Sequence, residues 1–379
     1  MLSNGSRESD FPSLAGRVYL NTAAEGIPPR PVLDALAQYG KDKLLGMDGR
    51  IPHQQQWESA KTRTASMYGL SSDEVSICSC SSEAYNLAAM ALGLTEGDEV
   101  VITDLDFPAG ATPWMQPSCP ATAKLWRARD WGLRIDDLPA LLSSKTRLVQ
   151  VSLVSFFNGF KVDLPAVVET VRKHSSALVA VDVTQALGRI PLDLNQVDLV
   201  ISSTHKWILA SHGGGLVGVP NRHSCELTTE AGGWFHLENA FDEDRFERTI
   251  TRPGAASFSV GMPNYAAVYA INAALQYIQF VDPVAIDAYA RPLVRACLDG
   301  IKSLGVELIT PDESDALAGI ISFRHPKSGD INKFLHARDI HIMEHAGRLR
   351  VAIHGYNTIS DIERLLQALK ESLGHVAAG

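Results

Sequence analysis

The sequence lacks any apolar run near the roughly 20 residues that a membrane-spanning helix needs. Its first ten residues are polar, and they contain no apolar stretch of the kind found in a secretory signal peptide. These two absences argue against a membrane protein. We therefore expect no membrane partner and a cytoplasmic location.

An excess of positive charge is also missing. The formal net charge is −9, from 34 Lys and Arg against 43 Asp and Glu, and the acidic residues are spread along the chain. Because nucleic-acid-binding proteins usually present a basic surface, the composition argues against a nucleic-acid partner.

Cysteine is scarce, and no two cysteines form a CxxC pair. An odd number of cysteines without a secretion signal indicates reduced thiols. The five positions are Cys78, Cys80, Cys119, Cys225 and Cys297. Three histidines, His336, His341 and His345, lie on a predicted loop without an accompanying carboxylate pattern, so we predict no metal site.

Short β-rich runs separated by helical patterns occupy the first two thirds of the chain. The expected strands are 74–77, 99–102, 147–151, 178–181 and 199–201. Helices are expected between these strands. Apolar residues have helical spacing over 82–94, and another helix is expected to begin at Asp163-Leu164-Pro165. Such alternation predicts an α/β fold with a mostly parallel sheet between helices.

The pattern changes near Pro263. Long helical stretches over 265–280 and 292–304 are followed by strand-like 318–323 and 349–353, and a capping box at Ser360 precedes a last helix. At 379 residues, 45% hydrophobic and 20% charged, the chain is long enough for two domains. We predict a large domain over 17–262 and a small C-terminal α+β domain over 263–379, joined by part of 1–16.

Two polar residues follow buried-looking strands, Asp182 after 177–181 and Lys206 after 198–201. Pyridoxal 5′-phosphate (PLP) needs a lysine amine for a Schiff base and a carboxylate for its pyridine nitrogen. In an open α/β sheet, groups at such strand ends share one ligand site. Taken singly, Asp182 could equally be a helix N-cap, and a His-Lys pair is mostly found on surfaces.

Two further segments follow strands. Ser81 and Ser82 precede a helix, where hydroxyls and free N–H groups can hold a phosphate, although serine there is more often only an N-cap. Phe107 could lie against a flat cofactor, although a strand-end aromatic in the core is the simpler interpretation.

Taken together, these residues resemble the class V aminotransferase superfamily of fold-type I PLP enzymes. This cysteine desulfurase-like group also contains selenocysteine lyases, kynureninase and isopenicillin N epimerase. The resemblance covers 18–369 and follows the family order of motifs. The matching segments are Tyr19-Leu20-Asn21-Thr22-Ala23-Ala24, Ser81-Ser82-Glu83-Ala84-Tyr85-Asn86, Asp182-x-x-Gln185, Ser203-Thr204-His205-Lys206, Gly261-Met262-Pro263-Asn264 and 350–358.

The resemblance implies a role for each matching residue. Lys206 would form the internal aldimine, Asp182 would pair with the pyridine nitrogen, and His205 would join them in the catalytic group. Arg350 would clamp the α-carboxylate of an amino-acid substrate. The implied cofactor contacts are Ser81, Ser82, Phe107, Asp182, Gln185, Ser203, His205, Lys206 and Asn264, and the implied substrate contacts are Arg350, Ala23, Phe156 and His354. A homodimer is also implied.

The chain departs from the desulfurase pattern at several positions. Phe107 replaces the histidine that usually stacks on the cofactor, and Phe156 replaces an asparagine beside the ring, which brings the chain nearer the kynureninase and epimerase branches. Met262 replaces a residue that donates an intersubunit hydroxyl to the phosphate, so its own backbone or Asn264 would have to compensate. Segment 340–349 lacks the nucleophilic cysteine of desulfurases and is too short for its loop.

We therefore expect a PLP-dependent enzyme that removes the α-proton of an amino acid. A β-elimination lyase without a persulfide cysteine is the first hypothesis, because elimination needs no second base. A class V aminotransferase and an amino-acid epimerase are the alternatives, and the epimerase would need an acid such as His212, His341, His345 or His354. A noncatalytic binding protein of this fold is the remaining alternative.

Overall fold

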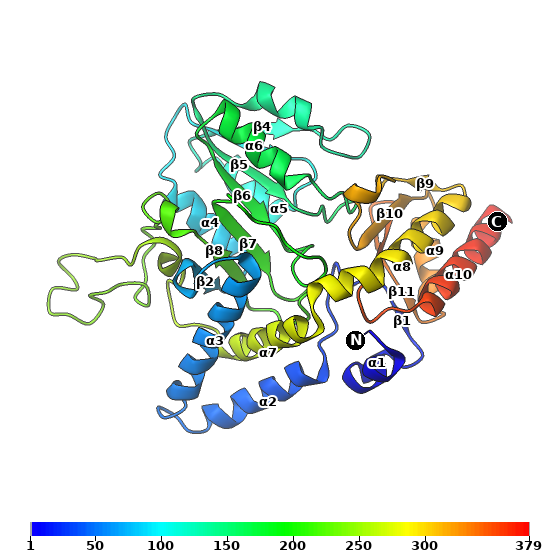
Figure 1. Ribbon diagram of the computed structural model, residues 1–379, viewed down its shortest axis with the longest axis horizontal. Coiled ribbons are helices and arrows are strands. Elements are labelled where there is room, and N and C mark those ends of the chain that lie inside the picture. The colour runs from blue at the N-terminus through cyan, green and yellow to red at the C-terminus, as the bar shows by residue number, and fades with distance from the viewer. Residues whose placement is uncertain (1, 379) are drawn as a thin grey trace.

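The structure is a computed structural model that describes residues 2–378, and its centre is a seven-stranded β-sheet (Figure 1). The strand order is β2-β8-β7-β6-β5-β3-β4, and only β8 runs antiparallel to its neighbours. The bounds are β2 Val75–Cys78, β3 Glu99–Thr103, β4 Thr122–Trp126, β5 Thr146–Ser152, β6 Leu178–Asp182, β7 Leu199–Ser203 and β8 Gly215–Gly218.

Alternate side chains of these strands enter two separate apolar cores. In β6, for example, Val179 and Val181 belong to one core, and Leu178 and Ala180 belong to the other. Both faces of a parallel sheet are covered in this way when helices cross from strand to strand. The predicted α/β fold with helices on both sides of a mostly parallel sheet is confirmed.

Helices from the first and last parts of the chain cover the sheet. In Figure 1, α3 and α7 lie side by side below it, and α2 packs along α7. The helices are α1 Asn4–Asp10, α2 Arg30–Lys43, α3 Arg50–Tyr68, α4 Ser81–Ala91, α5 Pro108–Ala111, α6 Leu164–His174, α7 Tyr265–Val281, α8 Pro283–Ser303, α9 Ser328–His336 and α10 Ile359–Ala378.

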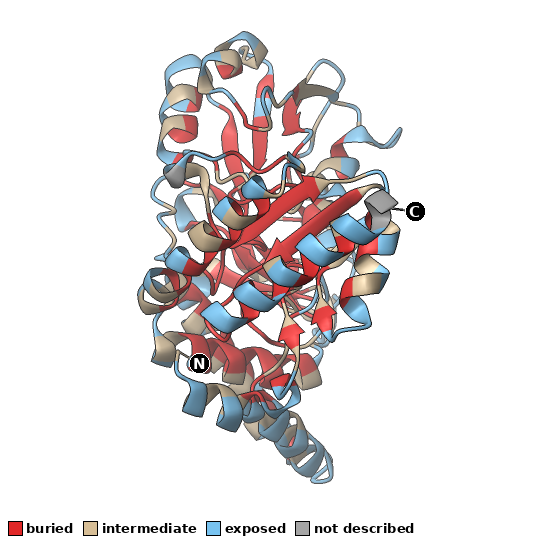
Figure 2. Cartoon of the chain, turned by 90° about the vertical axis from the view of Figure 1, so that its right-hand side faces the viewer, coloured by how far each residue is buried: buried red, intermediate tan, exposed pale blue. Residues whose placement is uncertain are grey.

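A second, four-stranded sheet lies beside the large one, in the order β12-β13-β10-β9. Its strands are β9 Glu307–Leu308, β10 Ile320–Arg324, β12 Met343–His345 and β13 Arg348–Ala352, and nearby β1 Val18–Tyr19 pairs with β11 Ile340–His341. Leucines, isoleucines and valines of α8, α9 and α10 form a core with these strands. Figure 2 shows the result, buried strands behind helices whose outer faces are exposed.

All seven predicted strands are present, each with ends within three residues of the prediction. Six strands were not predicted, namely β4 and β8 of the large sheet and the short β1, β9, β11 and β12. We expected a helix to begin at Pro292, but α8 begins at Pro283 and Pro292 lies inside it. The last helix is capped by Thr358 and not by Ser360, since Asp361 and Thr358 exchange hydrogen bonds between side chain and backbone.

The domain boundary between 262 and 263 stays a prediction. Residues of α7, such as Val268 and Leu275, pack in the core of the large sheet, whereas those of α8, such as Val294 and Leu298, pack in the core of the small sheet. No helix in the described part of the chain is both long and apolar enough to cross a membrane.

Candidate active site

Lys206 lies three residues beyond the end of β7, on the wall of a small cavity at the carboxyl ends of the parallel strands. This is where ligands bind in open α/β sheets. The structure brings most of the predicted site residues to this cavity. Its lining is Ser81, Phe107, Ser152, Val154, Phe156, Asp182, Thr184, Gln185, Ser203 and Lys206.

The amine of Lys206 is partly shielded from water. Burial lowers its pKa to about 8, with Arg350 acting in the same direction, while Asp182 and Glu25 oppose the shift. A lysine with a pKa near neutrality exchanges protons readily at physiological pH, which suits a nucleophile or a general base. Lys206 therefore has the electrostatic environment of a reactive amine.

Asp182 is held by two donors at the end of β6. The phenol of Tyr85 donates to Oδ2 at 2.9 Å, and the backbone N–H of Thr184 donates to Oδ1 at 2.7 Å. Burial and the charge of Asp182 raise the pKa of Tyr85 well above its usual range, so Tyr85 stays a donor. The carboxylate is thus fixed in orientation at the cavity wall.

Hydroxyl groups gather where α4 begins. The Oγ atoms of Ser81 and Ser203 lie 2.9 Å apart, and Ser81 is the first residue of α4. The backbone of Gly215 passes so close that a Cβ there would lie 2.4 Å from the carbonyl carbon of Cys80. Small hydroxyls at a helix N-terminus are suited to an anion such as a phosphate.

Two aromatic rings form one side of the cavity. Phe107 and Phe156 meet edge to face with their ring centres 4.9 Å apart, and the Lys206 amine lies 5.1 Å from the centre of Phe107. Phe107 is 43% exposed, although it is a large apolar side chain beside a polar cavity. A flat ligand would cover this exposed ring.

Arg350 reaches the same region from β13 of the small sheet. Its Nη1 donates to the carbonyl of Phe156 at 2.8 Å, while its buried Nε has no partner among the described residues. Burial lowers the pKa of Arg350 to about 9, and the neighbouring Arg348 adds to the effect. An unpartnered guanidinium near an amine is a candidate carboxylate-binding group.

Gln185, which lines the cavity, belongs to a buried network that also includes Ala23 and His354, neither of which lines it. Gln185 donates to the carbonyl of Ala23 at 3.0 Å and accepts from the Trp207 indole at 2.5 Å. The carbonyl of Trp207 lies 2.8 Å from Nε2 of His354, and the Gly355 N–H donates to its Nδ1 at 2.6 Å. Both ring nitrogens of His354 are occupied, so the structure does not bring this residue to the cavity as a substrate contact.

Three other predicted contacts, Ser82, His205 and Asn264, also lie outside the cavity lining. Ser82 is exposed on the first turn of α4. Asn264 caps α7 by accepting from the Ala267 N–H at 3.3 Å, and its side chain lies against Gly213. Asn264 lines a separate hollow near Met262, which is itself 44% exposed.

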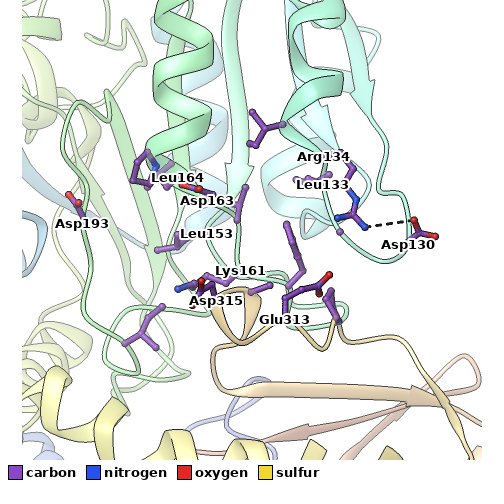
Figure 3. Close-up of a pocket in the computed structure, with 18 of the residues that line it drawn as sticks. Asp130, Leu133, Arg134, Leu153, Lys161, Asp163, Leu164, Asp193, Glu313 and Asp315 are labelled. Atoms are coloured by element: carbon purple, nitrogen blue, oxygen red, sulfur yellow. Dashed lines mark ion pairs between the residues drawn. The ribbon is translucent and has the colours of Figure 1, made fainter.

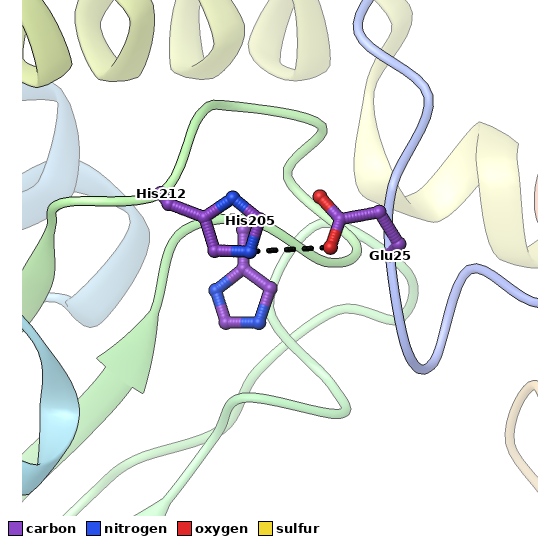
Figure 4. A group of neighbouring side chains, drawn as sticks. All are labelled: Glu25, His205 and His212. Carbon is purple, nitrogen blue, oxygen red and sulfur yellow. Dashed lines mark ion pairs between the residues drawn. The ribbon is translucent and has the colours of Figure 1, made fainter.

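His205 stacks on His212, and Figure 4 shows Glu25 beside them. The ring centres are 4.4 Å apart with planes inclined by 16°, and Glu25 pairs with Nε2 of His212 at 3.2 Å. Within the described ranges, this is the one group of such residues close enough together to be considered for a metal. Nitrogen lone pairs lie in the ring planes, so two nearly parallel rings do not direct them at one ion.

A larger cavity of about 440 Å³ opens next to the loop that follows β5 (Figure 3). Leu153 and Phe160 line it, whereas Val154 and Phe156 of the same segment line the cavity around Lys206. Its polar side chains include the exposed ion pair of Asp130 and Arg134 at 3.7 Å. No predicted site residue lies on its walls, and it supplies no reactive group comparable to Lys206.

Sequence reasoning missed several residues that shape the site, among them Tyr85, Ser152, Thr184 and Trp207. Tyr85 lies within a matching motif, and its helical spacing of four from Ser81 places both on the same face of α4. Thr184 lies within the Asp182 segment and accepts from the Ser203 N–H at 2.9 Å. The motif residues next to Tyr85 and Thr184 in the sequence were the signal that could have identified these two.

Comparison with known proteins agrees with this geometry. The family model "Aminotransferase class-V" matches residues 18–365. A cysteine desulfurase of Synechococcus elongatus is 27% identical over 95% of this chain, which spans 62% of that relative's length. An uncharacterized aminotransferase of Bacillus subtilis, YcbU, is 24% identical over 96% of this chain and 97% of its own length.

Solved structures show the same fold. The apo structure of a cysteine desulfurase from Thermococcus onnurineus NA1 superposes with a TM-score of 0.89 over 99% of this chain and 100% of that one, at 20% identity. The family match covers nearly the whole chain and includes every lining residue of the Lys206 cavity. The chain therefore belongs to the class-V aminotransferase family, and it is a PLP-dependent enzyme.

Proposed function

We propose that this enzyme is an amino-acid β-elimination lyase that works without a persulfide cysteine. The observation that carries the proposal is the position of Lys206, a partly buried amine on the wall of the cavity that Asp182 also lines, with Arg350 near enough for its charge to act on the amine. Its pKa of about 8 responds to both groups. An amine in this position can act on the α-carbon of an amino acid whose carboxylate is bound by Arg350.

The residues of the cavity fit PLP. Asp182 offers a fixed carboxylate for the pyridine nitrogen, Phe107 offers an exposed ring for stacking, and Ser81 and Ser203 offer hydroxyls for the phosphate. When bound, PLP supplies an aldehyde that condenses with amines and a pyridinium ring that accepts electrons from the substrate α-carbon. Lys206 is the one amine on the cavity wall among the described residues.

In this proposal Lys206 and Arg350 have different roles. Arg350 orients the substrate through its carboxylate, with its own position fixed by the Phe156 carbonyl. Nζ of Lys206 then takes the α-proton, which an amine with a lowered pKa can accept near neutral pH. The aromatic pair Phe107 and Phe156 shields this step from water.

The segment before Arg350 supports a reaction without persulfide. Strands β12 and β13 form a hairpin, and the residues between them are only Ala346 and Gly347, both with positive φ. A turn this short has no room for the cysteine-bearing loop that the family resemblance led us to look for. Elimination from Cβ needs no such thiol.

A class V aminotransferase is the second candidate, favoured by the name of the Bacillus subtilis relative. Transamination uses the same lysine and arginine but returns the proton to a different carbon. An epimerase needs an acid facing Lys206 across the substrate. None of the candidate histidines lines the cavity among the described residues, so we do not favour this reaction.

The experiment mixes the PLP-loaded enzyme with a panel of amino acids and follows cofactor absorbance, sulfide, keto acids and D-amino acids. A lyase releases a β-substituent, such as sulfide from cysteine, together with a keto acid, and leaves no added sulfur on the protein in an intact mass spectrum. A keto acid that forms only with an amino acceptor indicates the aminotransferase. A D-isomer without net loss of substrate, or sulfur retained on a cysteine, contradicts the proposal.

We further propose a homodimer, as the family resemblance implied, and the domain division at 262. Large apolar side chains are exposed at the α2–α3 connection and in the 230–250 segment, including Leu44, Met47, Phe241 and Phe246. Such residues commonly mark a protein–protein interface. Light scattering on the purified protein gives the mass that tests this state.

A further inference from the structure

Arg348 and Arg350 lie on the same face of β13, two residues apart. Side chains two apart on a strand point to the same side, with Cα atoms about 6.6 Å from each other. Both residues are almost fully buried, at 5% and 2% exposure. The Arg350 assignment concerns one carboxylate only, so Arg348 is a second buried cation without an assigned role.

The neighbouring strands supply no carboxylate to Arg348. In the register of the small sheet, Arg324 lies opposite it on β10 and His345 lies opposite it on β12. Residues directly opposite in an antiparallel pair share one face. Glu307 pairs with Arg324 at 3.7 Å, but neither Arg348 nor Arg350 has an ion pair among the described residues.

The two arginines use few of their donors. Arg348 donates from Nη1 to the carbonyl of Phe157, and Arg350 donates from Nη1 to the carbonyl of Phe156. A guanidinium has five N–H donors, and burying it without an opposite charge is costly. Burial lowers the pKa of Arg348 to about 10, and Arg324 adds to the effect. An anion bound beside Arg348 would offset both the cost of burying its charge and the repulsion from Arg324.

Arg348 is also close to the cavity of Lys206. Its guanidinium carbon lies 5.6 Å from the ring centre of Phe156, which lines that cavity, and 4.4 Å from the ring centre of Phe157. The same Phe156 holds Arg350 through its carbonyl. Phe156 therefore contacts both cationic groups, Arg350 through its carbonyl and Arg348 through its ring.

We propose that Arg348 forms a second anion-binding subsite, and that the substrates of this enzyme are amino acids whose substituent on Cβ carries an acidic group. The α-carboxylate binds Arg350, and the acidic oxygens of the Cβ substituent, which is the group that leaves in the elimination, bind Arg348. This inference rests on the proposed function, because it takes Arg350 as the α-carboxylate site.

The test compares acids with their neutral amides. The PLP-loaded enzyme is titrated with L-aspartate, L-glutamate and L-cysteine sulfinate, and with L-asparagine and L-glutamine, while the cofactor absorbance reports an apparent Kd. A charge-assisted hydrogen-bonded pair is worth roughly tenfold or more in affinity. We expect L-aspartate and L-glutamate each to bind at least about tenfold more tightly than L-asparagine and L-glutamine, respectively.

Three variants localise the preference. In Arg348→Met, the ratio of amide to acid Kd falls to near one, whereas Arg348→Lys retains part of it because the charge remains. Arg338→Met is the matched control, since this exposed arginine also lies over an aromatic ring, that of Phe334, but far from the cavity lining. It should keep the wild-type ratio, and the thermal unfolding of all three variants checks their folding.

The outcomes distinguish a failure of the Arg348 subsite from a failure of the proposed function. If amides bind as tightly as acids in the wild-type enzyme, or if Arg348→Met keeps the preference, the subsite is wrong and the proposed function stands. If no amino acid changes the cofactor absorbance, the Arg350 assignment and the proposed function both fail.

Discussion

The hydroxyl of Tyr85 donates a 2.9 Å hydrogen bond to the Asp182 carboxylate, and both side chains are buried. Gln150 donates in turn to the Tyr85 oxygen at 3.3 Å. The Thr184 N–H holds the other carboxylate oxygen at 2.7 Å. Tyr85 and Thr184 together therefore fix the direction in which Asp182 faces the cavity.

Replacing Tyr85 with Phe removes this donor and leaves a buried carboxylate with one hydrogen bond fewer. Hydrogen bonds to charged groups are worth about 1.5–3 kcal/mol, so we expect the unfolding free energy of the apoenzyme to fall by about that much. Tyr289→Phe is the matched control, because Tyr289 donates to a neutral carbonyl, that of Asn357, at 3.0 Å. Urea denaturation measures both, and equal losses in the two variants would argue against a special role for Tyr85.

Asp106, next to Phe107, should make the unfolding free energy of the protein depend on pH. Burial raises its pKa to about 7, and the charge of Asp182 adds to the effect. An unfolded Asp titrates near 3.9, so between about pH 4 and 7 the folded state binds the extra proton. Stability conferred by this group is therefore lost as pH rises through that window.

Asp106→Asn removes the titration. Relative to this variant, the wild-type apoenzyme should lose about 1–3 kcal/mol of unfolding free energy between pH 5 and pH 8, the upper value corresponding to the part of the pKa shift that lies above pH 5. Asp104→Asn, at an exposed carboxylate two residues earlier, should keep the wild-type slope. Parallel pH profiles for wild type and Asp106→Asn would show that Asp106 is not a raised carboxyl group.

Gly26 approaches the backbone of Lys206 more closely than any side chain allows. A Cβ at this position would lie 2.0 Å from the Lys206 carbonyl oxygen, and the Gly26 N–H donates to the His205 carbonyl at 2.8 Å. Gly26→Ala must displace the segment that holds the lysine. Overpacking of this kind costs about 1–3 kcal/mol, so PLP affinity should fall roughly tenfold or more.

The matched control is Gly40→Ala. This glycine lies in α2 with nothing within 4 Å of an added Cβ, so PLP affinity should be unchanged. Equilibrium dialysis against PLP measures both variants. Unchanged affinity in Gly26→Ala would mean that the contact between the N-terminal segment and the Lys206 segment does not position the amine.

The sequence predicted the parts of the structure that local patterns determine. Parallel strands such as β6 and β7 are short apolar runs ended by Asp182 and Ser203, and those polar ends are recognisable without a structure. Strand β8 was missed because Gly215–Gly218 is short and begins and ends in glycine, so only its pairing with β2 and β7 makes it a strand.

The site was predicted in its chemistry and less well in its surroundings. Lys206, Asp182 and Arg350 were identified through motifs. His354 also matched a motif, but both of its ring nitrogens are hydrogen-bonded to the backbone, of Trp207 and of Gly355. Arg348 could not be recognised, because its significance depends on Arg324 and His345 lying opposite it and on the absence of a carboxylate there. Such relationships arise between strands and leave no trace in the local sequence.

The most direct test of the account is the attachment point of the cofactor. The PLP-loaded enzyme is reduced with borohydride, digested, and its peptides are identified by mass spectrometry. We predict that the pyridoxyl group is found on Lys206 and that Lys206→Ala, which should still bind PLP through Asp182 and the serine hydroxyls, acquires no covalent label. A label on another lysine, or catalytic activity that survives in Lys206→Ala, would contradict the account.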